Sequence, residues 1–327
     1  MHPVLFSLGE TPIPAYGFLI AVALILGWML SLRLARIDKL PADQLGTAYV
    51  LSVGGGLLAA RMMWLFQHPE HEGGPAAIIQ LQAGQLTGFG GVLVGLIIAG
   101  MFCQNKKIPT WAWLDCAAPA FLLGMVIERL GAFLAGADFG HYVDPSFFLS
   151  VQFPADSLVY EVQRRDLAGM RLPADQSLPV HPSQLYAAGV AAVAAGLSMV
   201  VRARRQYSGQ VALFALASFA VTRYLIEDPF RYDMTPEVIG PLTLGQVTAM
   251  VVVVIVAVVH FMQSEKAMQD PAGLRQWLGG PWTPGAEGPA KGKKKKSGKK
   301  KSSTSSAAQP KTDKPEKAES ESESEPN

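Results

Sequence analysis

Two arginines lie inside otherwise apolar stretches, and they are the residues of this chain best suited to chemistry. Arg129 belongs to the run 121–135, and Arg223 belongs to a second run that ends before Pro229. An arginine in a membrane-spanning segment costs free energy unless it meets an anion or a wet cavity. Two guanidiniums at one depth provide planar, permanently charged groups that bind phosphate oxygens in pairs. The sequence therefore predicts a shared phosphate site, for a phospholipid headgroup or for a soluble anion.

Purely structural roles are also open for the arginines in apolar runs, which include Arg61. Arg61 follows the small-residue stretch 54–60, which allows helices to approach closely, and pairing with an acid or capping of carbonyls would explain it. Arg223 and Glu227 are four residues apart on one helical face, where a simple ion pair can form. The sequence alone leaves both ion pairing and anion binding open.

The elements that must position these arginines are long apolar runs. Of the 327 residues, 50% are hydrophobic and 17% are charged, below the charged fraction of about a quarter in soluble domains. Seven runs approach or reach the roughly 17 to 25 residues that cross a bilayer as a helix. They are 13–32, 45–66, 88–103, 111–135, 183–201, 210–226 and 242–262. We expect an all-α membrane protein, a polytopic bundle of seven transmembrane helices with an external loop domain.

Basic residues alternate between the loops that connect these runs. Lysines and arginines follow the first, third and fifth runs, whereas the N-terminus and the loop 67–87 have none. Because short cytoplasmic loops collect positive charge, we expect the N-terminus outside and the C-terminus in the cytoplasm. The transmembrane domain is then predicted at 1–265, with 136–182 as its external loop or head region.

The segment 266–327 differs in composition from the rest of the chain. A lysine-rich stretch at 291–301 precedes serines and threonines and then Glu-Ser repeats. This composition has too little apolar content to fold, so we expect a disordered cytoplasmic tail that is first polybasic and then acidic. Its positive charge beside a span would also attract anionic membrane lipids.

Five sequence patches resemble the prolipoprotein diacylglyceryl transferase family. They are Ala-Tyr-Gly at 15–17, Gly-Gly-Leu-Leu-Ala-Ala-Arg at 55–61, the stretch 115–140 around Glu-Arg-Leu-Gly-Ala-Phe, His-Pro-Ser-Gln-Leu-Tyr at 181–186 and Thr-Leu-Gly-Gln at 243–246. The resemblance covers residues 10–262 and implies a seven-span enzyme of the bacterial inner membrane. It implies transfer of the diacylglyceryl group of phosphatidylglycerol to the lipobox cysteine thiol of a prolipoprotein. A thioether forms, and glycerol 1-phosphate is released.

The same resemblance implies roles for single residues. By position, Arg129 matches the family's arginine that binds the lipid phosphate, and Arg223 matches a second essential arginine. Glu227 matches the acidic residue next to that second arginine. Tyr16 matches the tyrosine of the first span, and Gly140 matches the glycine that closes the signature. The implied partners are phosphatidylglycerol, other membrane lipids and prolipoprotein signal peptides with a lipobox cysteine. We expect no nucleic acid, no cofactor and no metal.

The chain departs from the family pattern at positions that concern catalysis. Phe89 stands where the family usually has a histidine proposed as general base, and Ala132 and Ala135 replace two asparagines. Further departures replace a small residue by Glu128, a tyrosine by Phe219 and a glutamate by Ala137. Loss of a positioned base lowers a rate by about 10²- to 10⁴-fold, and Asp138 and His141 are candidate substitutes. We expect a transferase that is weakened or uses another base; the alternative is a catalytically silent paralogue that binds anionic phospholipid or lipoprotein precursors.

Overall fold

The structure is a computed structural model that describes residues 4–8, 11–69, 78, 85–167, 172–232 and 237–269. The chain forms two compact units, Met1–Pro289 and Ala290–Asn327, and all described residues belong to the first. The predicted tail lies outside the described residues from residue 270 onward.

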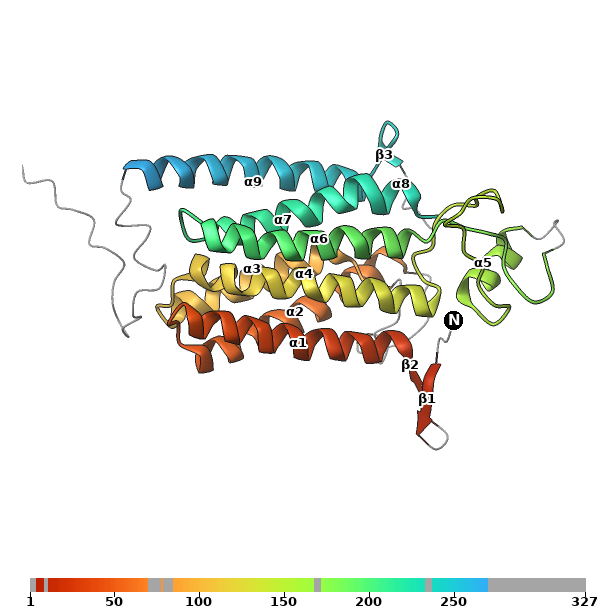
Figure 1. The fold of residues 1–327 in the computed structure, drawn as a ribbon, viewed down its shortest axis with the longest axis horizontal. Helices are drawn as coiled ribbons and strands as arrows, with labels where there is room; N and C mark the ends of the chain where they lie inside the picture. Colours follow the sequence, from red (N-terminus) through yellow and green to blue (C-terminus); the bar gives the residue numbers. More distant parts are fainter. Residues whose placement is uncertain are drawn as a thin grey trace, which may run out of the picture. The chain divides into compact units, whose positions relative to one another are not determined.

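Seven helical segments among the described residues are long and apolar enough to cross a membrane. They are α1 (Ala15–Ile37), α2 (Ala42–Gln67), α3 (Gly88–Asn105), α4 (Thr110–Ala135), α6 (Ser183–Arg204), α7 (Gln210–Thr222) continued by η2 (Arg223–Glu227) and α8 (Asp228–Phe230), and α9 (Leu244–Gln269). These helices run side by side in Figure 1. The predicted fold class is confirmed. Helix α9 continues to Gln269, past the domain boundary predicted at residue 265.

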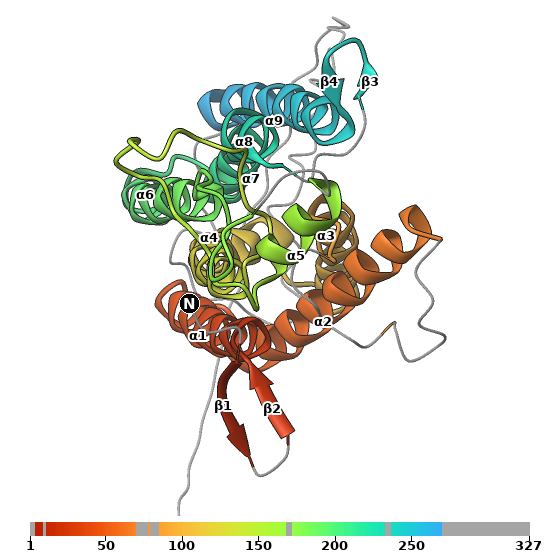
Figure 2. The same ribbon diagram turned by 90° about the vertical axis from the view of Figure 1, so that its right-hand side faces the viewer.

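Helix α4 lies at the centre of the bundle. It contacts α1, α3, α6 and α7, and the end-on view of Figure 2 places it among them. Helices α2 and α3 pack closely through small residues, since a Cβ on Gly56 would lie 2.8 Å from the carbonyl oxygen of Gly91. The small-residue stretch predicted at 54–60 is therefore a helix contact.

Arg61 has structural partners at this contact between α2 and α3. Its Nη1 donates to the side-chain oxygen of Gln85 at 2.5 Å, and its guanidinium lies 5.0 Å from the ring centroid of Trp64. The backbone N–H of Thr87 also donates to the carbonyl of Ala60 at 3.1 Å. These contacts support a structural role for Arg61. Its side chain joins α2 to the segment that precedes α3.

The remaining regular elements gather at one end of the bundle. Figure 1 shows there the hairpin of β1 (Val4–Leu8) and β2 (Thr11–Pro14), strand β3 (Glu237–Ile239), which pairs with β4 (Leu242–Thr243), and the short helix α5 (Leu158–Asp166). Helix α5 belongs to the segment 136–182, which has a small apolar core of its own. That core consists of Phe139, Phe153, Val159 and Val180. The predicted external region is thus a packed structure in its described part.

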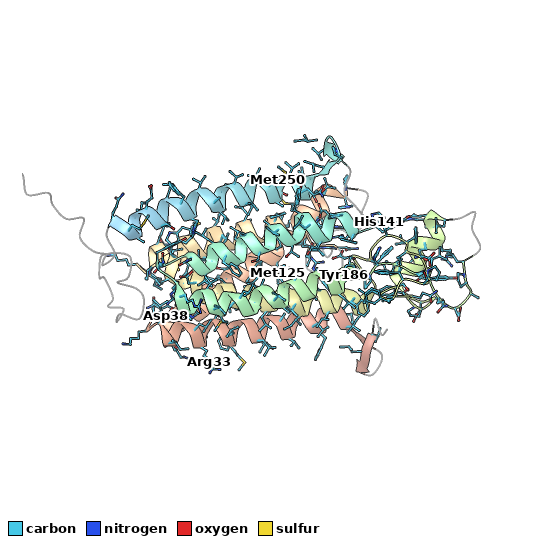
Figure 3. The ribbon with its side chains drawn as sticks, turned by 45° about the horizontal axis from the view of Figure 1, so that its top comes forward. Arg33, Asp38, Met125, His141, Tyr186 and Met250 are labelled. Atoms are coloured by element: carbon cyan, nitrogen blue, oxygen red, sulfur yellow. The ribbon has the colours of Figure 1, made fainter. Side chains whose placement is uncertain are left out.

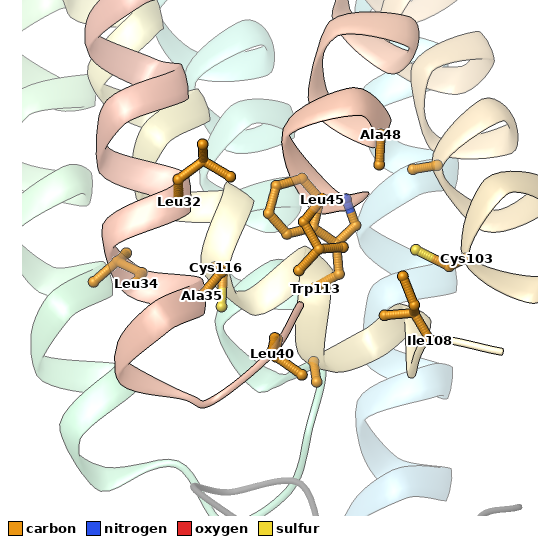
Figure 4. Packing of buried hydrophobic residues seen from close by; sticks show 12 residues of the cluster. Leu32, Leu34, Ala35, Leu40, Leu45, Ala48, Cys103, Ile108, Trp113 and Cys116 are labelled. Carbon is orange, nitrogen blue, oxygen red and sulfur yellow. The ribbon is translucent and has the colours of Figure 1, made fainter. Parts of the chain in front are cut away.

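Buried charges join the loops at the opposite end. Asp38 lies 2.8 Å from Arg202 and 2.8 Å from Arg205, and it is labelled in Figure 3 at the end away from His141. An apolar cluster adjoins it, in which Trp113 packs between α1 and α2, as Figure 4 shows. This end is therefore held by ion pairs and by a close-packed core.

Asp115 caps helix α7 from across the bundle, and its loss should lower stability. Its carboxylate accepts backbone hydrogen bonds from Gly209 and Val211 at 2.9 Å and from Ala212 at 3.0 Å. Asp115→Ala leaves these N–H groups without their acceptor, so we expect the free energy of unfolding to fall by about 2 kcal/mol or more. The measurement is thermal unfolding in detergent, with the exposed Asp43→Ala as the matched control. Equal losses in both variants would contradict the capping role.

Candidate functional site

A turn after α4 carries an acid back toward the helix. Helix α4 ends at Gly136 with φ of 70°, and Asp138 also has a left-handed backbone with φ of 54°. Helix α6 holds this turn: Ser183 Oγ donates to the carbonyl of Asp138, and Gln184 Nε2 donates to the carbonyl of Ala137, both at 2.6 Å. These two side chains therefore fix the position of the Asp138 carboxylate.

Carboxylates surround the guanidinium of Arg129. Its Nε lies 3.1 Å from Glu128, its Nη1 lies 2.7 Å from Asp138, and its Nη2 lies 3.2 Å from Glu227. The side chain is only 12% exposed. A charge so buried requires paired partners, and Arg129 has one at each of its three nitrogens.

Arg223 meets one of the same carboxylates from a different helix. Its Nη1 lies 2.8 Å from Glu227, and its Nε lies 2.6 Å from Asp228. These residues lie in η2 and α8, where a π-turn widens the helix, a feature that is frequent at functional sites. The two oxygens of Glu227 thus contact Arg129 and Arg223 respectively, and the two arginines converge on one carboxylate.

Tyr16 joins the cluster through Glu128. Its hydroxyl donates to Glu128 Oε1 at 3.2 Å, and the residue is 4% exposed. Gly131 leaves room for the tyrosine ring, because a Cβ at that position would lie 3.3 Å from it. The close packing of α1 against α4 therefore places the Tyr16 phenol beside the charged end of α4.

Three charged residues of the cluster were not assigned to it from the sequence. Arg231 lies 2.9 Å from Asp138, Asp228 accepts a short hydrogen bond from Thr243, and Glu128 contacts Arg129. For Arg231 and Asp228 the available signal was the concentration of charge at 223–231, at the end of an apolar run, and for Glu128 it was the place next to Arg129. The charge at 223–231 did not reveal that Arg231 meets Asp138 or that Asp228 meets Thr243, because these partners come from other segments.

Gly140 and His141 border the cluster. Gly140 N donates to the carbonyl of His181 at 3.0 Å, and a Cβ at Gly140 would lie 2.6 Å from that oxygen. His141 N donates to the carbonyl of Phe230 at 2.9 Å, and its exposed ring packs against Tyr232. Gly140 is therefore a point of close backbone approach, and the side chain of His141 lies on the surface.

Phe89 and Phe219, two residues that the resemblance marks as departures from the expected pattern, lie together. The ring centroids of Phe89 and Phe219 are 4.9 Å apart in an edge-to-face contact, and Phe219 also packs against Phe121 at 5.7 Å. Phe89 is therefore part of an aromatic contact between α3, α4 and α7.

The cluster carries more negative than positive formal charge. Its cations are Arg129, Arg223 and Arg231, and its anions are Glu128, Asp138, Glu227 and Asp228, so the sum is 3 − 4 = −1. Burial raises the pKa of the Asp138 carboxyl, but the charges of Arg231 and Arg129 outweigh burial and hold this pKa below its ordinary value. An incoming phosphate must therefore displace carboxylates from the arginines.

Comparison with known proteins agrees with the sequence patches. A family model described as prolipoprotein diacylglyceryl transferase matches residues 3–262. A relative from Trichormus variabilis is 29% identical over 257 residues, which cover 76% of this chain and 84% of the relative. A relative from Bacillus cereus is 26% identical over 269 residues, which cover 82% of this chain and 94% of the relative. One from Synechococcus elongatus is 31% identical over 185 residues, which cover 56% of this chain and 59% of the relative. All three are named phosphatidylglycerol–prolipoprotein diacylglyceryl transferase. The region matched by the family model contains the whole cluster.

Proposed function

Because the chain belongs to the prolipoprotein diacylglyceryl transferase family, we propose that it transfers the diacylglyceryl group of phosphatidylglycerol to the lipobox cysteine of prolipoproteins. The family membership and the seven candidate spans make it a multi-pass membrane transferase of lipoprotein biosynthesis. The observation in this chain that supports the proposal best is the convergence of Arg129 and Arg223 on Glu227. The reaction needs fixed cations where the leaving phosphate gains charge, and these arginines supply them.

The proposed role of the arginines is to exchange carboxylate partners for phosphate oxygens. In the structure carboxylates already hold each guanidinium in place, three of them around Arg129 and two around Arg223. Glu227 spans both arginines and keeps them at a fixed separation. The site is therefore preorganised, and the phosphate gains binding energy without ordering flexible side chains.

The other site residues take supporting roles in the proposal. Asp138 links Arg129 to Arg231, and Gly140 allows the backbone of this segment to pass close to His181. The sequence predicts an outward-facing N-terminus, and the hairpin of β1 and β2 lies at the end of the bundle where α4 also ends. The cluster is accordingly proposed to face the outer leaflet, where phosphatidylglycerol enters sideways from the bilayer.

We propose that turnover is slow although the lipid still binds. Cationic groups act on the bound lipid and on the leaving phosphate alike, whereas a base acts mainly in the transition state. The arginines are present, but the aromatic contact of Phe89 with Phe219 has no group that accepts a proton. The lack of a base at position 89 therefore lowers turnover more than it lowers affinity for the lipid, even where another residue takes over the proton.

Transfer to a synthetic lipobox peptide tests the proposed function. We expect full-length protein in vesicles containing phosphatidylglycerol to add a diacylglyceryl group to the peptide, which is measured as a gain in peptide mass. Ester hydrolysis should then remove the acyl chains and leave a glyceryl group attached to the cysteine by a thioether. A peptide with serine in place of its cysteine, and vesicles of phosphatidylcholine alone, are the controls and should give no gain. Binding of phosphatidylglycerol without any transfer would contradict the enzyme and favour the silent lipid-binding alternative.

A further inference from the structure

The four carboxylates of the cluster are held in different ways. Glu227 contacts two guanidiniums, and so does Asp138, which pairs with Arg129 and Arg231. Asp228 pairs with Arg223 and also accepts the hydroxyl of Thr243. The side chains of these three acids are 3 to 8% exposed.

Glu128 is held more loosely than the other three. The contacts described for its carboxylate are one to Nε of Arg129 at 3.1 Å and one from the hydroxyl of Tyr16 at 3.2 Å. Its side chain is 24% exposed, three times as much as that of Asp138 at 8%. Glu128 is therefore the most accessible carboxylate of the cluster, and with Asp228 it is one of the two for which a single guanidinium contact is described.

Protonation of the other acids is unfavourable for a simple electrostatic reason. A proton on Asp138 or Glu227 would weaken contacts to two guanidiniums at once. Consistently, the pKa of Asp138 lies below its ordinary value: burial would raise it, but the charges of Arg231 and Arg129 lower it more. Asp138 therefore holds Arg129 and Arg231 by ion pairs and is a weak proton acceptor.

The position of Glu128 suits a thiol that attacks a lipid held by Arg129. The two residues are adjacent in α4, and Glu128 presents Oε2 to the arginine and Oε1 to Tyr16. A thiol with a pKa of about 8.5 is only a few per cent ionised at neutral pH, so transfer needs a neighbouring proton acceptor. Phe89 supplies no such group, and the ring of His141 is exposed.

We propose that Glu128 accepts the proton of the substrate cysteine, an assignment that rests on the proposed transferase function. The S–H proton moves to the Glu128 carboxylate, and the sulfur forms a bond to the terminal glyceryl carbon of phosphatidylglycerol. The bond from that carbon to the phosphate oxygen breaks, and its electron pair leaves with glycerol 1-phosphate beside Arg129 and Arg223. Glu128 then returns its proton to solvent or to the departing phosphate. Tyr16 is the positioning residue, since it donates to the same carboxylate.

The charged and titratable groups around Glu128 come from four segments. They are Tyr16 on α1, Arg129 on α4, Asp138 in the turn after α4 and Glu227 in η2. The partial burial of Glu128 and the two acids favour the protonated form, whereas Arg129 and the hydroxyl of Tyr16 favour the ionised carboxylate. Both forms of Glu128 therefore have a stabilising neighbour, as a group that gains and loses a proton in each cycle requires.

The test is the pH dependence of transfer in Glu128→Gln. At neutral pH we expect this variant to be slower than the wild type by about 10²- to 10⁴-fold. The remaining rate of this variant should follow the fraction of ionised peptide thiol, so it should rise tenfold per pH unit up to about pH 8.5, the ordinary pKa of a thiol. Near that pH the difference in rate between the variant and the wild type should become smaller. Glu128→Asp keeps a carboxylate and should keep the wild-type pH profile at a reduced rate. The exposed Glu161→Gln is the matched control and should change nothing.

Affinity and folding are measured on the same proteins. Phosphatidylglycerol binding to Glu128→Gln should remain within a few-fold of the wild type, and its melting temperature should stay close to that of Glu161→Gln. A Glu128→Gln variant with the wild-type rate and pH profile would overturn the assignment and leave the proposed function intact. Loss of lipid binding, or an Asp variant with the pH profile of the Gln variant, would overturn it too. No transfer by the wild type would overturn both proposals.

Discussion

Arg129→Ala is expected to lose phosphatidylglycerol binding and to lower transfer by about 10³-fold or more, because it removes the guanidinium proposed to hold the phosphate. It also leaves Glu128, Asp138 and Glu227 without a shared cation at a site where the arginine is only 12% exposed. Removing one partner of a buried ion pair costs about 3–5 kcal/mol, so the melting temperature should fall as well.

Arg129→Lys separates the charge of this residue from its shape. An ammonium keeps the positive charge but cannot direct three nitrogens at three carboxylates. We therefore expect partial recovery of stability and little recovery of transfer. The measurements are thermal unfolding, lipid binding and peptide transfer, with Arg165→Ala as the control because the side chain of Arg165 is 75% exposed. Full transfer by Arg129→Ala would contradict the account of the site.

Gly140→Ala should be the most damaging change of a single methyl group. Its Cβ would lie 2.6 Å from the carbonyl oxygen of His181 and 2.8 Å from that of Phe230, and both are backbone atoms. To make room, the bridge between Gly140 and Arg231 must open, and Arg231 then moves away from Asp138. We expect a loss of about 1–3 kcal/mol in stability and of about 10²-fold in transfer, since small misplacements at a site are costly.

Two glycines of α6 provide matched controls for this variant. A Cβ on Gly189 or Gly196 would have no atom within 4 Å, so the added methyl group meets open space. Alanine also favours a helix over glycine by about 0.5–1 kcal/mol. Gly189→Ala and Gly196→Ala should therefore keep or raise the melting temperature and keep transfer. If Gly140→Ala behaved like these controls, the close backbone approach would have no functional importance.

The helical framework followed from the sequence because its apolar runs are long and distinct. The run predicted at 88–103 is α3, Gly88–Asn105, and the run at 111–135 is α4, Thr110–Ala135. The sequence did not place α4 at the centre of the bundle. That arrangement depends on which helix faces pack together. In helices that are apolar on all sides, the sequence does not mark which face is buried.

Arg129 and Arg223 were predicted as site residues for the same reason, because a charge stands out in an apolar run. Their partners were harder to find. Asp138 reaches Arg129 only because the backbone turns at Gly136 and because α6 holds the turn through Ser183 and Gln184. Such contacts depend on a left-handed turn and on a distant helix, neither of which has a periodic signature.

Glu128 illustrates how a departure from a family pattern acquires meaning from the structure. In the sequence it was a glutamate in place of a small residue. In the structure its carboxylate lies between the Tyr16 phenol and Arg129, at the charged end of α4. It differs from Asp138 and Glu227 in pairing with one guanidinium instead of two, and from Asp228 in its greater exposure. Only three-dimensional contacts reveal these differences.

The central claim is that this chain performs the family reaction with the cluster around Arg129. Growth of a bacterial strain depleted of its own prolipoprotein diacylglyceryl transferase tests it most directly, with wild-type chain or Arg129→Ala supplied in trans at matched membrane levels. The account predicts growth and lipid-modified lipoproteins with the wild type, and neither with Arg129→Ala. Growth supported equally by both chains, or no growth with wild-type protein that is folded in the membrane, would contradict it.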